Sequence, residues 1–208
     1  MFKKNNLLVA ASGTGGHIFP ALAVSKELED EWNIHWLGVQ QRLDANFIPK
    51  KYNLRTLNIK TPRKNIFLFY QYIEILMSTF QIIRILKENK IKLVFTTGGY
   101  ISAPTIVASK LLSIPIIIHE SNLIPGMVTK YFCFLCNYVL LGFKNTNSYL
   151  RNCKTIFTGT PLREQFYKSN PLPEWVPKGK GPLLIVMGGS QGAKAINCLL
   201  YTSDAADE

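Results

Sequence analysis

Apolar residues recur along the chain in short runs that longer mixed segments separate. The first 161 residues contain seven such runs, each rich in Val, Ile, Leu or Phe: 6–12, 33–39, 54–59, 92–99, 115–121, 138–143 and 155–161. Continuous apolar runs of this length are typical of strands that are buried on both faces of a parallel sheet. Most of the intervening segments are long enough for a crossover helix. The pattern therefore predicts an α/β protein with a Rossmann-like, doubly wound parallel sheet.

The composition changes after the seventh run. Segment 171–182, PLPEWVPKGKGP, is dense in Pro, Gly and Lys, which is typical of a linker between domains. Beyond it, LLIVMGGSQGAKAINCLL repeats the order of apolar strand, glycine turn and helix start that opens the chain. We expect a first domain over residues 1–170, a linker over 171–182, and the first strand, loop and helix of a second Rossmann-like domain over 183–208.

A glycine-rich loop, within ASGTGGHIFPALAVSKEL, follows the first predicted strand. Glycine lets backbone amides approach a ligand closely, and the N-terminus of the following helix adds a partial positive charge, so the ligand is expected to be an anion such as phosphate. The loop lacks the Lys and Ser/Thr of a Walker A motif, and Ile18 stands at the third glycine position of a dinucleotide fingerprint counted from Gly13. After the second strand, Gln40 and Gln41 stand where a nicotinamide enzyme usually carries an acid.

Three further polar loops follow predicted strands: TTGGYISAP, HESNLIPG and GTPLRE. Because the carboxyl ends of parallel strands meet at one edge of a sheet, we expect these loops to lie near the glycine loop. Their residues suit an anionic sugar-phosphate: exposed amides at Gly98 and Gly99, hydrogen bonds and acid/base chemistry at His119, Glu120 and Asn122, and a bidentate phosphate contact at Arg163.

The chain is basic, with 24 Lys and Arg against 13 Asp and Glu and a formal net charge of +11. The excess favours an acidic partner such as phosphate, nucleic acid or an anionic membrane surface. A compositional habit of a Lys-, Asn- and Ile-rich chain explains it equally well, since net charge alone says little about partners.

The four cysteines do not form the pattern of a disulfide framework. Cys133 and Cys136 form a C-x-x-C within YFCFLCNYVLL, but no second pair and no nearby histidine completes a zinc site. Thiols packed in the core of a reduced, cytoplasmic protein are therefore expected, and no metal. The N-terminal MFKKNN and the short apolar run after it lack the h-region and cleavage site of a signal peptide.

Five motifs, in this order and at these spacings, resemble the MurG-like N-acetylglucosaminyltransferases of glycosyltransferase family 28: GTGGHIFPALAV, GGYISAP, HESNLIPG, GTPLRE and GGSQGA. The resemblance runs through Leu200. It implies the GT-B fold, in which two Rossmann-like domains face each other across a cleft. It also implies inverting transfer of N-acetylglucosamine from UDP-N-acetylglucosamine to the lipid-linked acceptor lipid I, which forms lipid II for peptidoglycan, without a cofactor.

The resemblance further implies roles for single residues. The donor, UDP-N-acetylglucosamine, is contacted by Thr14, Gly15, Gly16, Asn122, Arg163 and Ser190. The general base that activates the acceptor hydroxyl is either His17 or Glu120. The acceptor pyrophosphate is met by Gly98, Gly99 and Tyr100. Ala103 stands where the family often has glycine, so this loop departs from the family pattern at one position.

Segment 66–88 predicts an amphipathic helix. Its narrow polar stripe consists of Gln71, Glu74, Ser78, Gln81 and Arg84. Its broad apolar arc consists of Phe67, Phe69, Tyr72, Ile73, Leu76, Phe80 and Ile83. Charges interrupt it too often for a membrane span. Either the arc packs on the sheet, or an exposed apolar edge also dips into the membrane interface, which KTPRKN at 60–65 favours through contact with anionic lipid.

A lipid-linked acceptor implies a peripheral protein on the cytoplasmic face of the bacterial inner membrane, with cell-wall synthesis proteins as further partners and no nucleic acid. Two other function classes remain open. One is a nonenzymatic, membrane-associated acceptor-binding subunit of a split N-acetylglucosaminyltransferase, against which GGSQGA argues. The other is a nucleotide-dependent oxidoreductase, against which Ile18 and Gln40 argue. The final YTSDAADE does not resemble the family, and we expect the chain as given to be inactive alone.

Overall fold

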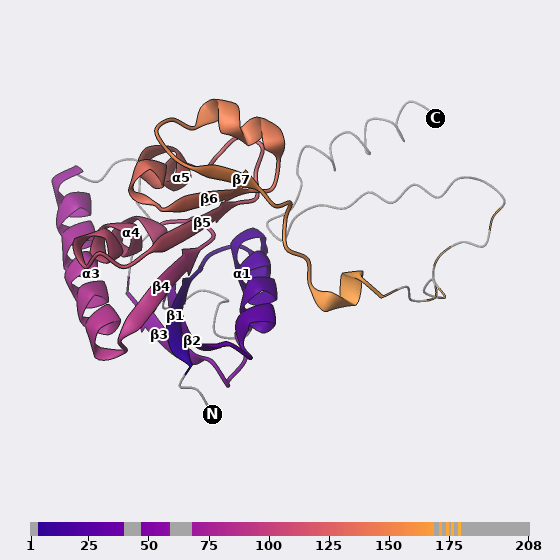
Figure 1. The fold of residues 1–208 in the computed structure, drawn as a ribbon, viewed down its shortest axis with the longest axis horizontal. Coiled ribbons are helices and arrows are strands. Elements are labelled where there is room, and N and C mark those ends of the chain that lie inside the picture. Colours follow the sequence, from indigo (N-terminus) through magenta and orange to yellow (C-terminus); the bar gives the residue numbers. More distant parts are fainter. Residues whose placement is uncertain are drawn as a thin grey trace, which may run out of the picture. The chain divides into compact units, whose positions relative to one another are not determined.

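The computed structural model describes residues 4–39, 47–58 and 68–168, together with residues 171, 174, 176 and 179. It divides the chain into two compact units, Met1–Tyr167 and Lys168–Glu208. The predicted linker at 171–182 and the predicted second domain at 183–208 lie almost entirely outside the described residues, as do Gln40 and Gln41. The fold below is that of the first unit (Figure 1).

The first unit contains one seven-stranded sheet in which every neighbouring pair of strands is parallel. Its strands are β1 (Asn5–Ala10), β2 (Trp32–Val39), β3 (Asn53–Leu57), β4 (Ile91–Thr96), β5 (Ile116–Glu120), β6 (Tyr138–Leu141) and β7 (Thr155–Phe157). Their order across the sheet is β3-β2-β1-β4-β5-β6-β7. Each strand overlaps one of the seven apolar runs, so the predicted doubly wound parallel sheet is confirmed.

Strand β1 shows why the apolar runs are continuous. Its residues Leu7, Leu8, Val9 and Ala10 are all fully buried. Leu8 and Ala10 belong to the core cluster on one face of the sheet, and Leu7 and Val9 belong to the cluster on the other. Because successive side chains point to opposite faces, a strand covered by helices on both sides has no solvent-facing position that would be polar.

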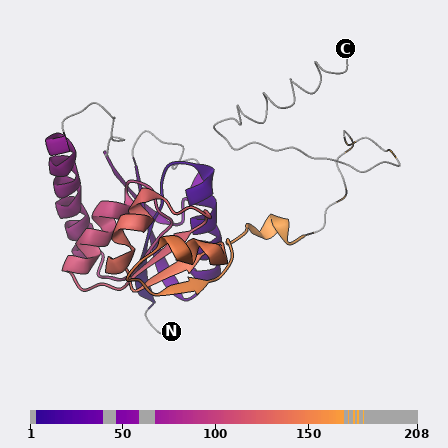
Figure 2. The ribbon, with the colours of Figure 1, turned by 90° about the horizontal axis from the view of Figure 1, so that it is seen from above.

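Within the described residues, α-helices and short 3₁₀ helices complete the unit. They are α1 (Gly15–Leu28), α3 (Leu68–Glu88), α4 (Ser102–Leu111), α5 (Met127–Phe132), η1 (Cys133–Leu135), η2 (Lys144–Tyr149) and η3 (Glu164–Phe166). Helix α1 covers one face of the sheet, and α3 and α4 cover the other (Figures 1 and 2).

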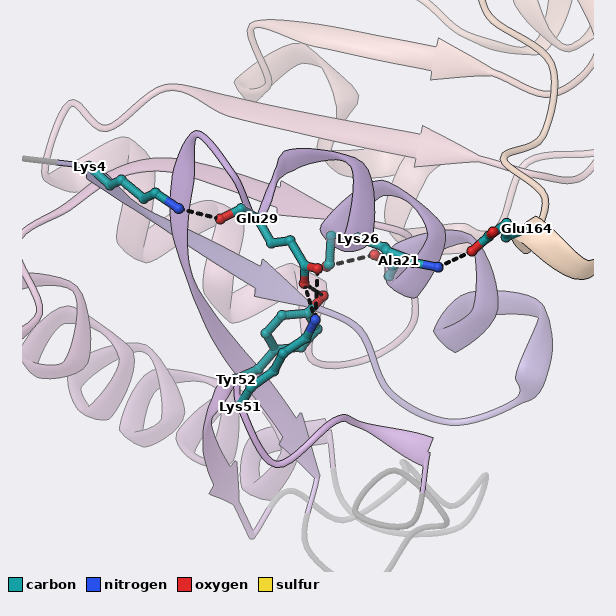
Figure 3. A network of polar contacts seen from close by, with 8 residues as sticks. Lys4, Ala21, Lys26, Glu29, Lys51, Tyr52 and Glu164 are labelled. Atoms are coloured by element: carbon teal, nitrogen blue, oxygen red, sulfur yellow. Dashed lines mark hydrogen bonds and ion pairs between the residues drawn. The ribbon is translucent and has the colours of Figure 1, made fainter. Parts of the chain in front are cut away.

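The C-terminal end of α1 is held by a cluster of polar contacts around Glu29 (Figure 3). Lys51 Nζ and Tyr52 Oη each donate to the Glu29 carboxylate over 2.7 Å, and Lys4 Nζ donates to its backbone carbonyl over 2.8 Å. These contacts join α1 to the segment that enters β3 and to the residue that precedes β1. These contacts therefore hold in place the helix whose N-terminus forms the end of the glycine loop.

The cysteines of the C-x-x-C are buried, as predicted for packed thiols. Cys133 and Cys136 belong to the core cluster formed by α4, β5, β6 and η1, and both are free thiols. Burial raises the pKa of Cys136 to about 12, so this thiol is neutral at physiological pH. Among the residues that the structure describes, no group of three or more His, Cys, Asp or Glu side chains could hold a metal ion.

The helix predicted over 66–88 is present as α3. Ser78 of the polar stripe is buried, with 5% of its surface exposed. Leu76 and Phe80, which belong to the predicted arc, are 55% and 64% exposed, whereas Ile83 packs against a core cluster of the sheet. The arc is therefore covered at one end and exposed over Leu76 and Phe80. Phe67 and the side chains of Phe69, Gln71, Tyr72 and Glu74 lie outside the described residues.

Packing between α3 and α4 explains this orientation. The buried face of α3 carries Ser78 and Thr79, small side chains that let two helices approach closely. Thr79 Oγ1 donates to the carbonyl of Ile75 over 2.8 Å, so its hydroxyl is satisfied within its own helix. One turn further, Ile82 and Leu86 are fully buried in the core cluster of the sheet. No helix within the described ranges is both long enough and apolar enough to span a membrane.

Candidate functional site

The order of the strands reverses direction between β1 and β4. The chain runs from β1 outward to β3 and then returns to β4, which lies beside β1 on its other side. In doubly wound sheets, ligands bind at the carboxyl ends of the strands where the direction of winding reverses. The loops that follow β1 and β4 are therefore the centre of the candidate site.

The glycine loop after β1 becomes the first turn of α1. Thr14 is the N-cap residue, with extended φ and ψ of −93° and 161°, and Gly15 and Gly16 are the first two helical residues. No side chain caps this helix end, and no acidic residue lies in its first turn. The partial positive charge of the helix N-terminus is therefore not neutralised by the helix itself, as an anion site requires.

His17 joins the loop after β1 to the loop after β4. Its Nδ1 lies 2.6 Å from the carbonyl oxygen of Thr97, and Thr97 Oγ1 donates in return to the carbonyl of His17 over 2.9 Å. Since a carbonyl oxygen only accepts, Nδ1 carries the proton, and in the neutral ring Nε2 holds the lone pair. No hydrogen bond within the described part of the chain occupies Nε2. The ring is thus fixed as the tautomer that can accept a proton.

Gly98 and Gly99 form the turn against which the His17 ring lies. Both adopt left-handed backbone conformations, with φ of +90° and +83°. A Cβ at Gly98 would lie 3.4 Å from His17 Cε1, and one at Gly99 would lie 3.4 Å from the carbonyl oxygen of Ser12. The left-handed backbone therefore favours glycine at both positions, and a Cβ at either would be in ordinary van der Waals contact. Tyr100, the next residue, is 41% exposed at the entrance to α4.

Glu120 ends β5 and organises the loop that follows it. The side chain is buried, with 4% of its surface exposed. Its Oε1 accepts from the Asn122 backbone N–H over 3.0 Å and from Asn122 Nδ2 over 2.8 Å, and its Oε2 accepts from the Gly126 N–H over 3.0 Å. Both carboxylate oxygens are occupied, and the exposed amide of Asn122 is held in one orientation.

His119 links the β5 loop to the loop after β7. It is 1% exposed; its Nε2–H donates to the carbonyl of Gly159 over 3.0 Å, and Ser121 Oγ donates to its Nδ1 over 3.2 Å. Burial lowers the pKa of His119, and the bond to Gly159 opposes this effect. The lowered pKa favours the neutral ring. A histidine used in this way positions two loops and does not face a ligand.

Arg163 lies against aromatic rings. Its Cζ is 4.2 Å from the ring centroid of Phe19 in α1 and 5.2 Å from that of Phe166 in η3. Its Nε is buried and has no hydrogen-bond partner within the described residues. The loop after β7 is thereby brought to α1, one turn beyond Gly15 and Gly16.

The structure places the predicted site residues in three groups. His17 contacts Gly98 and Gly99, Glu120 holds Asn122, and Arg163 stacks on Phe19 near the start of α1. Ser190 lies outside the described residues. Sequence reasoning missed Thr97 and Phe19, the residues that hold His17 and Arg163. The only signals for them are the doubled threonine before the glycines and an aromatic residue one helical turn after Gly15.

Comparison with known proteins agrees with this geometry. The pattern of the glycosyltransferase family 28 N-terminal domain matches residues 7–141. Two relatives from Prochlorococcus marinus strains MIT 9215 and MIT 9312 are 91% and 92% identical over 203 residues. Both are named UDP-N-acetylglucosamine–N-acetylmuramyl-(pentapeptide) pyrophosphoryl-undecaprenol N-acetylglucosamine transferase. The match covers 98% of this chain but 56% of each relative, so the chain spans little more than half their length.

Solved structures give the same result for the fold. The crystal structure of MurG from Acinetobacter baumannii is similar at 29% sequence identity and a TM-score of 0.66, over 77% of this chain and 47% of that one. A UDP-N-acetylglucosamine 2-epimerase from Methanocaldococcus jannaschii, at 15% identity and a TM-score of 0.56 over 74% of this chain and 46% of its own, shares the fold alone. By the match of its residues 7–141, and with the parallel sheet and loops that the match covers, the chain belongs to glycosyltransferase family 28.

Proposed function

We propose that this chain forms the acceptor side and the first phosphate contacts of an N-acetylglucosaminyltransferase, which transfers N-acetylglucosamine from UDP-N-acetylglucosamine to lipid I and forms lipid II. The relatives at 91% and 92% identity carry the corresponding name, which supports this substrate pair. The observation that carries the proposal is the position of His17, fixed at the switch point with Nε2 free beside two glycine turns.

The reaction requires a base and a site for the leaving group. The acceptor hydroxyl oxygen bonds to C1 of the donor sugar while the bond from C1 to the phosphate oxygen of UDP breaks, which inverts the configuration at C1. The hydroxyl proton passes to His17 Nε2. The charge that develops on UDP is stabilised by the N-terminus of α1 at Gly15 and Gly16 and by the guanidinium of Arg163.

Of the two candidate bases, the geometry favours His17. Glu120 is buried, and its two oxygens already accept three hydrogen bonds from its own loop. A buried carboxylate that already accepts three hydrogen bonds is less available to an acceptor hydroxyl than the unbonded Nε2 of His17. We assign Glu120 the role of orienting Asn122 toward the donor, with Gly98, Gly99 and Tyr100 facing the acceptor.

A transfer assay tests the proposed function. The chimaera for this assay joins residues 1–200 to the remaining C-terminal part of the strain MIT 9312 relative, whose intact protein is the positive control. We expect the chimaera to convert radiolabelled UDP-N-acetylglucosamine and lipid I to lipid II, and the 208-residue chain to bind the donor weakly and transfer no sugar. A leaving group that is held from one side only is not oriented for reaction. A folded chimaera that binds lipid I and transfers nothing would instead indicate an acceptor-binding subunit.

We also propose that α3 attaches the protein to the cytoplasmic face of the bacterial membrane as a peripheral protein. Among the exposed apolar side chains of this helix, four follow the spacing i, i+3, i+4 and i+7 of one helix face: Ile73, Leu76, Met77 and Phe80. Arg84 lies one turn beyond Phe80 on the same face, and 81% of its side chain is exposed. A row of exposed apolar side chains that ends in a basic residue suits the interface of an anionic membrane. KTPRKN lies outside the described residues.

Replacing Leu76 and Phe80 with glutamine is expected to weaken binding to anionic vesicles about tenfold or more, because each large apolar side chain contributes about 1.5–3 kcal/mol when it leaves water. Binding of the wild-type chain should also fall as salt rises, since salt screens the attraction of its basic residues. Cosedimentation with vesicles at low and high salt measures both effects. The matched control replaces Ile156 and Phe157 with glutamine. These residues are 46% and 51% exposed on β7, and the variant should bind like wild type. Equal losses in the two variants would contradict this placement of α3.

A further inference from the structure

We infer that Phe19 is a positioning residue for the donor contact: its ring fixes the guanidinium of Arg163 beside the N-terminus of α1 before any ligand binds. The inference rests on the proposed function, in which Arg163 contacts the donor phosphates. Three observations carry it: the confinement of the Phe19 ring, the docking of the Arg163 segment along α1, and the buried Nε of Arg163.

The Phe19 ring has little room to move. A Cβ at Gly15 would lie 2.7 Å from Phe19 Cε2, so the ring lies directly against the glycine at the start of the same helix. Phe47 meets it edge to face, with centroids 5.4 Å apart and an interplanar angle of 79°. Arg163 Cζ lies 4.2 Å from the ring centroid. The absence of a side chain at Gly15 thus serves the arginine as well as the phosphate, because it makes room for the ring that supports Arg163.

The segment that carries Arg163 is docked along the same helix at a second point. Glu164 forms an ion pair with Lys26, as Figure 3 shows. Phe19 and Lys26 are seven positions apart, which places them two turns apart on one face of α1. The ring of Phe166 lies 5.2 Å from Arg163 Cζ. Consecutive residues of this segment therefore contact one face of α1, and the arginine does not extend freely into solvent.

This arrangement leaves the arginine able to bind an anion. A guanidinium stacks through its flat faces and donates hydrogen bonds along its edges, so contact with a ring does not consume its donors. A side chain that is already oriented loses less conformational freedom on binding than a free one. The Nε–H of Arg163 is a buried donor with no partner among the described residues, and a bound anion would satisfy it. Phe19 thus holds Arg163, before the ligand arrives, in the orientation in which it contacts phosphate.

Nuclear magnetic resonance of the 208-residue chain tests the stacking without any activity. In the wild type, the Nε–H signal of Arg163 is expected to be shifted by the ring current and protected from exchange with water. Phe19→Leu should abolish both properties, and Phe19→Tyr, which retains the aromatic face, should restore them. Phe157→Leu is the matched control, because the Phe157 ring on β7 forms a cation–ring pair of its own, with Lys144 Nζ 5.2 Å from its centroid. An unchanged Arg163 signal in folded Phe19→Leu overturns the inference.

Titration of UDP-N-acetylglucosamine into the same variants tests the consequence for binding. Phe19→Leu should weaken binding about fivefold, the range of a cation–ring contact, and Phe19→Tyr should bind like wild type. In an Arg163→Ala background, Phe19→Leu should have no further effect, since a positioning residue acts only through the arginine. Equal losses in both backgrounds overturn the inference while leaving the proposed function intact. A wild-type chain that binds no donor contradicts the proposed function instead, whatever the state of the Arg163 signal.

Discussion

Replacing His17 with alanine in the chimaera is expected to lower kcat for lipid II formation about a hundredfold or more, the usual contribution of a general base. The ring is held by its Nδ1–H bond to Thr97, so Nε2 is the atom left to receive the proton of the acceptor hydroxyl. The KM for UDP-N-acetylglucosamine should change little, because in the proposed mechanism the donor phosphates contact the N-terminus of α1 and Arg163. A radiolabelled transfer assay over a range of pH measures both constants.

His17→Asn separates the chemical role of the ring from its structural role. The asparagine amide nitrogen takes the place of Nδ1 and can still donate to the Thr97 carbonyl, whereas nothing takes the place of Nε2. We expect His17→Asn to be as slow as His17→Ala but to unfold at the wild-type temperature. His35→Gln is the control, since this histidine lies within β2, where its ring contacts Asn53. Near-wild-type turnover of His17→Asn would exclude His17 as the base.

The sheet could be predicted because burial on both faces leaves a signal in each strand separately. Each of the seven apolar runs in the first 161 residues contains most or all of a strand. Parallel topology then places the polar loops at one edge of the sheet, where the strands end. That Gly98 and Gly99 would lie near the glycine loop follows from this reasoning alone. The core and the outline of the site therefore depend on patterns that are local in sequence.

Contacts between distant residues leave no such pattern. Nothing in the sequence pairs Arg163 with Phe19, or the Thr97 carbonyl with His17, because each contact depends on how two loops approach each other. The sequence left two orientations of α3 open for a related reason. Helical periodicity shows which residues share a face, but the buried face was decided by close packing on α4, which small Ser78 permits and large Phe80 does not.

The second large effect is expected at Glu120. In Glu120→Gln, one carboxylate oxygen becomes an NH₂ group that faces an N–H donor of Asn122 or Gly126, so at least one buried hydrogen bond is lost. The free energy of unfolding should fall by about 2 kcal/mol, the usual cost of leaving a buried polar group unsatisfied. Since loss of any of these bonds loosens the loop that carries Asn122, the KM for UDP-N-acetylglucosamine should rise and kcat should fall.

The shape of the pH profile distinguishes a positioning role for Glu120 from a catalytic one. If Glu120 only orients Asn122, the residual activity of Glu120→Gln keeps the wild-type dependence on pH, whereas loss of a general base removes the acidic limb of the profile. Glu88→Gln is the matched control, since this exposed carboxylate pairs with Arg84 on the surface of α3, where such pairs contribute little to stability. Denaturant titration and transfer kinetics on the two variants measure stability and catalysis separately. A Glu120→Gln protein of wild-type stability without the acidic limb would assign the proton transfer to Glu120 and leave His17 the task of joining the loops after β1 and β4.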